Sequence, residues 1–155
     1  MKRFYRLAIV LFLLIAVNVS FAQQRPFGLG VMIGEPTGIS AKLWTSSVNA
    51  LDFGLGWSVY NDNSGNRIHF HMDYVWHSFS AIRSTQQFPL YYGIGGRFNG
   101  GRDRESSLAV RGVLGIIWLP GGTPFDLFLE MAPSLQLIPS TGFAIDAAIG
   151  IRYFF

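Results

Sequence analysis

The side chains best suited to chemistry are three histidines in one short segment. His69, His71 and His77 have the same odd-number parity as Asp73, so an extended chain would place all four on one face. A serine nucleophile could be assembled from Ser58, His69 and Asp73, because a histidine oriented by a carboxylate can activate a hydroxyl group. His69 and His71 could also offer two nitrogens to a metal ion, but no third ligand is spaced to complete a site.

The elements that carry these residues decide between a chemical and a structural role. From Phe27 onward, large apolar residues alternate with small or polar ones, which is the two-residue period of a β-strand. The alternation predicts eight strands, over residues 27–34, 39–44, 51–60, 68–77, 90–98, 108–118, 125–137 and 143–155. Turn-forming residues interrupt the alternation and no stretch is long enough for a linker, so a single all-β domain is expected.

Composition narrows the classes of protein. The chain has 155 residues, of which 50% are apolar, 15% aromatic and only 14% charged. Soluble domains average about 25% charged residues. There is no cysteine, which excludes a disulfide framework, a thiolate metal site and a cysteine nucleophile.

Residues 1–22 have the composition of a cleaved secretory signal peptide. Basic residues (Lys2, Arg3 and Arg6) precede an apolar stretch over residues 7–17, and small residues flank position 21. A single amphipathic or membrane helix is the alternative. Without this segment, residues 23–155 keep nine of the 12 basic residues against nine acidic ones, so nothing in the charge favours nucleic-acid binding.

The two faces of the predicted strands differ sharply. One face is almost entirely Leu, Ile, Phe, Trp or Val, while the other mixes glycine, alanine, serine, histidine and single charges. The interior of an eight-stranded barrel is too narrow for so many large apolar groups, and they fit better facing lipid. We therefore predict an eight-stranded antiparallel up-and-down transmembrane β-barrel that follows a cleaved signal peptide.

Aromatic residues near the strand ends are consistent with two interfacial girdles. One group comprises Phe27, Phe53, Trp76, Phe79, Phe88, Trp118, Phe125, Tyr153 and Phe155, and the other comprises Trp57, Phe70, Phe98 and Phe143. Ordinary core aromatics would give a similar pattern.

The C-terminus carries the most specific motif. Ala147, Ile149, Ile151, Tyr153 and Phe155 end the chain on alternate apolar residues with a terminal phenylalanine. With this motif the chain resembles the bacterial outer-membrane β-barrel superfamily, in particular its small OmpA-like and OmpX-like members. The resemblance implies Sec-dependent export, insertion into outer-membrane lipid of the Gram-negative cell envelope, and recognition of Tyr153 and Phe155 by the barrel assembly machinery.

Two features depart from that family. The 80–87 connection, expected on the periplasmic side, is longer than the outer turn at residues 35–37. Pro133 falls inside the seventh strand, where it removes a hydrogen bond from the ladder of a barrel that has no free edge.

Small and charged residues are expected to fill the lumen. Centring the hairpins on their turns places Gly95 opposite Arg111 and Glu130 opposite Gly150. An unpaired buried charge costs several kcal/mol, so the inward charges should pair. The hypothesis is a plug of ion pairs formed by Lys42, Asp52, Asp73, Arg111, Glu130 and Arg152. The histidines are then structural groups of the lumen.

The function predicted from these observations is an integral outer-membrane barrel with a plugged polar lumen and a structural, membrane-anchoring or surface-binding role. The longest predicted outer loop, residues 99–107, carries the weak binding candidates Arg102, Asp103, Arg104 and Glu105, which also suit a solvated hairpin tip. The alternatives are a porin-like pore for small solutes, a lipid-modifying outer-membrane enzyme and a soluble periplasmic β-barrel binding protein. No catalytic residue, metal or cofactor is predicted, and the ligand or protein partner is unknown.

Overall fold

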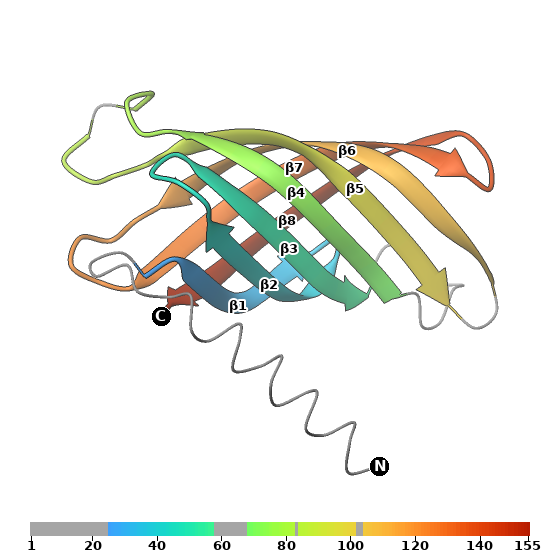
Figure 1. Cartoon of the computed structure of the whole chain (residues 1–155), viewed down its shortest axis with the longest axis horizontal. Coiled ribbons are helices and arrows are strands. Elements are labelled where there is room, and N and C mark those ends of the chain that lie inside the picture. The colour runs from blue at the N-terminus through green and yellow to red at the C-terminus, as the bar shows by residue number, and fades with distance from the viewer. Residues whose placement is uncertain (1–24, 58–67, 83, 102–103) are drawn as a thin grey trace, which may run out of the picture.

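The described residues form a closed barrel of eight antiparallel strands, in which each strand pairs with its neighbours in the sequence (Figure 1). The computed structural model describes residues 25–57, 68–82, 84–101 and 104–155, and the predicted signal peptide at 1–22 lies outside them. The strands are β1 (Phe27–Gly34), β2 (Thr37–Trp44), β3 (Asn49–Trp57), β4 (Ile68–Ser78), β5 (Leu90–Gly101), β6 (Arg104–Trp118), β7 (Phe125–Ile138) and β8 (Gly142–Phe154). The predicted all-β, eight-stranded up-and-down barrel is confirmed.

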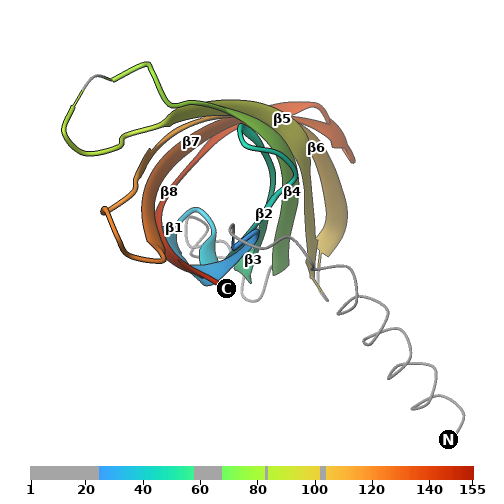
Figure 2. The same ribbon diagram turned by 60° about the vertical axis from the view of Figure 1, so that its left-hand side comes forward.

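The barrel is closed by the pairing of the first strand, β1, with the last strand, β8 (Figure 2). Gly28 of β1 lies opposite Lys42 of β2 on one side and opposite Phe154 of β8 on the other. We call the end of the barrel where β1 begins and β8 ends the terminal end. Among the described residues no helix is long and apolar enough to cross a membrane.

The alternation of the sequence becomes a division between lumen and outer surface. In β4, His69, His71 and Asp73 are buried, whereas Phe70 and Met72 are exposed. Successive side chains of a strand point to opposite faces, so this inside–outside order continues along every strand. The charged face is the inner one and the large apolar face is the outer one.

Glycines make room for the large inward side chains. A Cβ atom at Gly150 would collide with the ring of Phe128, and one at Gly115 would collide with the ring of Tyr91. Both rings are buried. The lumen is therefore packed by large groups lying over positions that have no side chain.

The predicted outer loop over residues 99–107 is wrong. β5 continues to Gly101 and β6 begins at Arg104, with a shift of register between Asn99 and Gly101. Extended pairing satisfies backbone groups that a loop would leave to solvent, and a bulge accommodates the extra residue. The connection between these strands is therefore short.

Pro133 lies within β7 without a bulge. It is opposite Ile145 of β8, and the register of β7 against β6 is the same before and after it. Gly112 and Val113 of β6 are the residues left out of the β6–β7 ladder at this point. The proline lacks an N–H group, so the interruption falls where that donor is missing.

The predicted register was partly right. Gly95 lies opposite Arg111, as expected, but Glu130 lies opposite Ala148 and not Gly150. The β7–β8 pairing ends at Gln136 opposite Gly142, so the turn is centred one residue earlier than the turn composition suggested.

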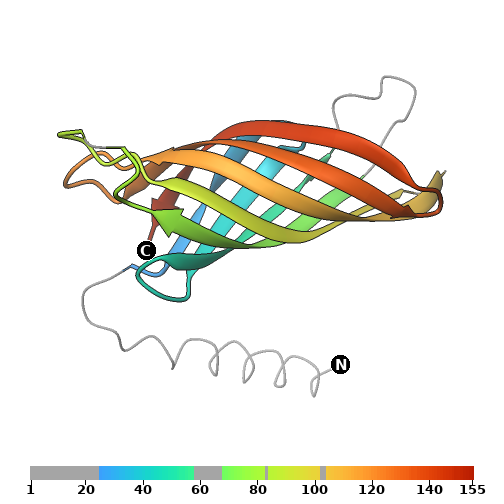
Figure 3. The ribbon, with the colours of Figure 1, turned by 90° about the horizontal axis from the view of Figure 1, so that it is seen from above.

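The connection between β4 and β5 is longer than the turn between β1 and β2, as expected, and it projects beyond the terminal end of the barrel (Figures 1 and 3). Gln87 pairs with Leu119, and Nε1 of Trp118 donates a hydrogen bond of 2.7 Å to Oε1 of Gln86. These contacts attach the described part of the connection to the end of β6.

Candidate functional site

The candidate site is the polar interior of the barrel, which contains two groups of charges. The first group lies within a few residues of the strand ends at the terminal end, and we call it the terminal cluster: Lys42, Asp52, Asp126 and Arg152. The second lies further along the lumen, and we call it the central cluster: Asp73, Arg97, Arg111, Glu130 and Asp146. Every member of both clusters is buried.

The terminal cluster pairs each cation with a carboxylate. Nζ of Lys42 is 3.0 Å from Oδ1 of Asp52. The guanidinium group of Arg152 donates to Asp126 through Nε at 3.0 Å and through Nη2 at 3.0 Å, and its Nη1 is 3.4 Å from Asp52. Two-point contact between a guanidinium and a carboxylate is a strong and directional form of ion pair.

Aromatic rings and a histidine complete the surroundings of the two cations. Arg152 lies over the ring of Phe128 at 4.1 Å, and Lys42 lies 4.9 Å from the ring centroid of Tyr91. Nζ of Lys42 also donates to Nε2 of His77 at 2.9 Å. These contacts replace water around charges that have left solvent.

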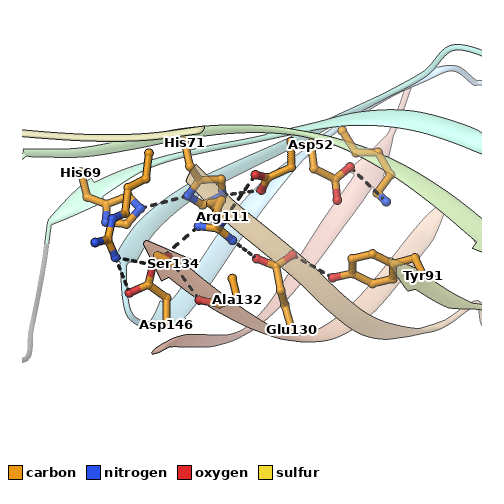
Figure 4. Close-up of polar contacts among 12 residues, drawn as sticks. Asp52, His69, His71, Tyr91, Arg111, Glu130, Ala132, Ser134 and Asp146 are labelled. Carbon is orange, nitrogen blue, oxygen red and sulfur yellow. Dashed lines mark hydrogen bonds and ion pairs between the residues drawn. The ribbon is translucent and has the colours of Figure 1, made fainter. Parts of the chain in front are cut away.

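The central cluster is built around Arg111 (Figure 4). Its Nη2 donates to Glu130 at 2.7 Å, its Nε is 3.2 Å from Asp73, and its Nη1 is 3.9 Å from Asp146. Arg97 donates to both carboxylate oxygens of Asp146 at 2.8 Å. Arg111 of β6 therefore contacts carboxylates from β4, β7 and β8. Of these strands only β7 is a neighbour of β6.

Tyr91 connects the two clusters. Its hydroxyl group donates to Oε2 of Glu130 at 2.9 Å, while the face of its ring lies beside Lys42. Burial of the tyrosine is nearly complete, so both contacts are shielded from solvent.

The structure places the six residues of the sequence hypothesis in two groups and not one: Lys42, Asp52 and Arg152 contact one another in the terminal cluster, and Asp73, Arg111 and Glu130 do so in the central cluster. The hypothesis omitted four participants: Tyr91, Arg97, Asp126 and Asp146. The signal that could have found the three charged ones is their inward parity, because each alternates in phase with the other lumen residues of its strand.

The histidines lie in polar contacts of the lumen. A hydrogen bond of 3.1 Å joins Nε2 of His69 to Nδ1 of His71, and His77 contacts Lys42 and the backbone oxygen of Val48. Asp73 approaches His71 and not His69. Ser58, the nucleophile of the hypothetical catalytic set, lies outside the described residues.

One group of side chains has the composition of a metal site. His71, Asp73 and Glu130 each offer a ligand atom, and these atoms all lie within 4.8 Å of one another. His69 is not part of this group, so it differs from the His69–His71 pair considered from the sequence; Glu130 comes from β7, and sequence spacing does not reveal a contact across the barrel.

The remaining predicted sites lie at the ends of strands. Arg104 begins β6, Glu105 is exposed, and Arg102 and Asp103 lie outside the described residues. Tyr153 packs edge-on against Phe155 with ring centroids 5.0 Å apart. Both rings are on the outer surface.

The outer surface is apolar from end to end. Ile33, Phe143 and Ile145 are 67%, 71% and 58% exposed, and similar side chains face outward from every strand. Outward rings gather near the terminal end, where Trp76 stacks on Tyr92 at 5.9 Å and Phe125 contacts Tyr153 at 5.1 Å.

Comparison of the chain with protein-family models, with curated proteins and with solved structures gave no match.

Proposed function

We propose that the protein is an integral β-barrel of the bacterial outer membrane, held there by its outer surface and closed by its charged lumen. The observation that carries the proposal is that the charged face of the strands points into the barrel and the apolar face points outward. Nine charged side chains of the two clusters are buried inside, while isoleucine, leucine, phenylalanine and tryptophan side chains cover the outside. In water such an outer surface would be far larger than the apolar patches that monomers expose.

Backbone hydrogen bonding also supports a membrane location. In hydrocarbon a spanning segment must satisfy its own N–H and C=O groups, and a closed barrel does so through its ladders. Outward aromatic rings at the terminal end, such as Trp76, Tyr92 and Tyr153, suit the interface between lipid and water.

The lumen is better suited to a plug than to a pore. Ion pairs between strands that are not neighbours, Arg97–Asp146 and Arg152–Asp52, meet in its interior. The buried ring of Tyr91 lies between the two clusters, and Arg152 lies over the buried ring of Phe128. The role that follows is structural or membrane-anchoring, or surface binding through the outer ends of the strands. Neither role requires a catalytic residue.

Biogenesis follows from the same proposal. The segment 1–22 would direct export by the Sec pathway, and the outward rings of Tyr153 and Phe155 would be available to the barrel assembly machinery before the barrel closes. The mature barrel would then be in contact with outer-membrane lipid.

The decisive experiment compares folding with and without an amphiphile. The chain 23–155 is refolded in detergent micelles, in lipid vesicles and in plain buffer, and is analysed by gel migration before and after boiling. A faster-migrating unboiled band in the two amphiphiles, with aggregation in buffer, is expected. A folded monomer in buffer would overturn the membrane proposal and favour a soluble periplasmic barrel.

A substitution in the middle of the outer surface sharpens this test. Leu129 is 55% exposed and lies inside β7, away from both ends of the strand. Leu129→Arg should lower the free energy of unfolding in vesicles by about 2 to 4 kcal/mol, because it places a charge in hydrocarbon. Ser140→Arg, at an exposed turn, is the control and should have little effect.

Single-channel recording in planar bilayers separates the plug from the pore. The native protein should show no steady conductance, whereas Arg111→Ala, which removes the centre of one cluster, should admit ions or fail to fold. Steady conductance of the native barrel would favour the small-solute pore, and turnover of added phospholipid or lipid A that His69→Ala abolishes would favour the enzyme.

A further inference from the structure

The central cluster has one more carboxylate than it has cations. Arg97 pairs with Asp146 at 2.8 Å and Arg111 pairs with Glu130 at 2.7 Å, which leaves Asp73 with only a share of Arg111. The terminal cluster, by contrast, has two cations and two carboxylates. A buried charge without its own countercharge is costly, so Asp73 is a position where an additional cation would be stabilising.

Asp73 is also short of hydrogen bonds. Its side chain is 1% exposed, and neither carboxylate oxygen has a hydrogen-bond partner among the described residues. Oδ1 is 3.2 Å from Nε of Arg111, whereas Oδ2 faces Nε2 of His71 at 3.9 Å, which is too long for a hydrogen bond. Oδ2 therefore points toward a second potential ligand without contacting it directly.

His71 is held in an orientation that suits a residue that binds a metal ion. Its Nδ1 is 3.1 Å from Nε2 of His69, so the tautomer with the proton on Nδ1 donates to His69 and leaves a lone pair on Nε2. Histidines that bind metals commonly donate their other N–H group to a fixed partner in this way. In that tautomer the free lone pair is on the nitrogen that faces Asp73.

Glu130 completes the group from β7, with its ligand atom within 4.8 Å of those of His71 and Asp73. One imidazole nitrogen and two carboxylate oxygens form a ligand set that Zn²⁺ accepts, at metal–ligand distances of about 2.0 to 2.2 Å. Asp73 supplies the surplus negative charge, and Glu130 would be shared between the ion and Arg111, which also keeps its contact with Asp146. Ligand atoms up to 4.8 Å apart must move closer together to meet one ion at these distances.

We propose that His71, Asp73 and Glu130 bind one divalent transition-metal ion of the Zn²⁺ class inside the lumen. The ion would join β4 to β7, which are not neighbours in the barrel, and would act as a structural crosslink. This proposal does not require the membrane location, so its test and the folding test in amphiphiles can fail independently.

The test uses the chain 23–155 folded in detergent and freed of metal with a chelator that is then removed. Zn²⁺ is titrated by calorimetry, and Co²⁺ is added separately so that its visible absorption reports nitrogen and oxygen ligands. We expect one ion per chain, and a higher melting temperature of the faster-migrating gel band when Zn²⁺ is present.

Variants identify the ligands. Asp73→Asn removes the surplus carboxylate and should fold well, but its affinity for Zn²⁺ should fall by at least about tenfold. His71→Gln should do the same. His69→Ala removes an outer partner and should weaken binding while leaving a Co²⁺ spectrum. The matched control is His77→Gln. His77 is a lumen histidine that contacts Lys42 of the terminal cluster, and this variant should bind Zn²⁺ like the native chain.

Two outcomes overturn the proposal. One is the absence of Zn²⁺ binding by the native chain, or binding that Asp73→Asn and His71→Gln do not alter. The other is stability that increases as the pH falls in the presence of chelator, without any response to Zn²⁺. That result would mean that a proton supplies the missing positive charge at Asp73.

Discussion

The two clusters of the lumen differ in how well their buried charges are matched by countercharges. In the terminal cluster, Arg152 makes a two-point contact with Asp126, and Lys42 is paired with Asp52. In the central cluster, Arg111 is shared among several carboxylates, and neither side-chain oxygen of Asp73 has a hydrogen bond from the described residues. The difference teaches that burial alone does not make a stabilising ion pair, because only matched charges offset the loss of hydration.

The largest expected effect comes from breaking the matched cluster. Arg152→Met removes the two-point partner of Asp126 and the second partner of Asp52. The free energy of unfolding, measured by urea titration in vesicles, should fall by about 3 to 5 kcal/mol, because a buried carboxylate loses its countercharge. A change below 1 kcal/mol would show that water enters the terminal end freely.

Removing the carboxylate of the same pair should cost less. Asp126→Asn leaves Arg152 with Asp52 at 3.4 Å, so the guanidinium keeps one countercharge. The same urea titration should show a loss of about 3 kcal/mol, at the lower end of the range for a broken buried pair. A loss equal to or greater than that of Arg152→Met would contradict the assignment of Asp52 as the shared partner.

The link between the clusters is tested by Tyr91→Phe. The substitution keeps the ring beside Lys42 and removes the hydroxyl group that donates to Glu130. A hydrogen bond to a charged acceptor contributes about 1.5 to 3 kcal/mol, and the loss should lie in this range. In a double-mutant cycle with Glu130→Gln the two effects should not add, whereas additive effects would mean that the contact contributes nothing.

The smallest effect is expected where the charges are unmatched. Without metal, Asp73→Asn removes the surplus carboxylate and should change the free energy of unfolding by less than about 1 kcal/mol, or raise it. This is the most direct check of the comparison, because Asp126→Asn is the same chemical change in the other cluster. Equal losses for the two variants would refute the distinction between the clusters.

Much of the fold follows from local pattern. The two-residue alternation predicts all eight strands and which face of each is apolar, and the parity of Lys42, Asp73 and Glu130 predicts that they point inward. The errors occur where the local pattern gives no signal. Glycine and serine around residues 100–107 look like a loop, yet backbone pairing continues to Gly101 in β5 and begins at Arg104 in β6.

The contacts inside the lumen depend on strands that are far apart in the sequence. Arg97 of β5 meets Asp146 of β8, and Arg152 of β8 meets Asp52 of β3. No spacing rule relates such pairs, because their separation depends on the register of every intervening strand and on the curvature of the closed wall.

The sequence by itself therefore determined the strands, their two faces and the set of inward charges, because the direction of a side chain in a strand is a property of its own backbone. Only the tertiary structure decided which of those charges meet. The one-residue shift of the β7–β8 turn placed Glu130 opposite Ala148, pairing of β6 with β7 brought Glu130 to Arg111, and the curvature of the closed wall brought it to Tyr91 of β5 and His71 of β4. Matching of buried charges is a consequence of register and closure, and those are properties of the whole barrel.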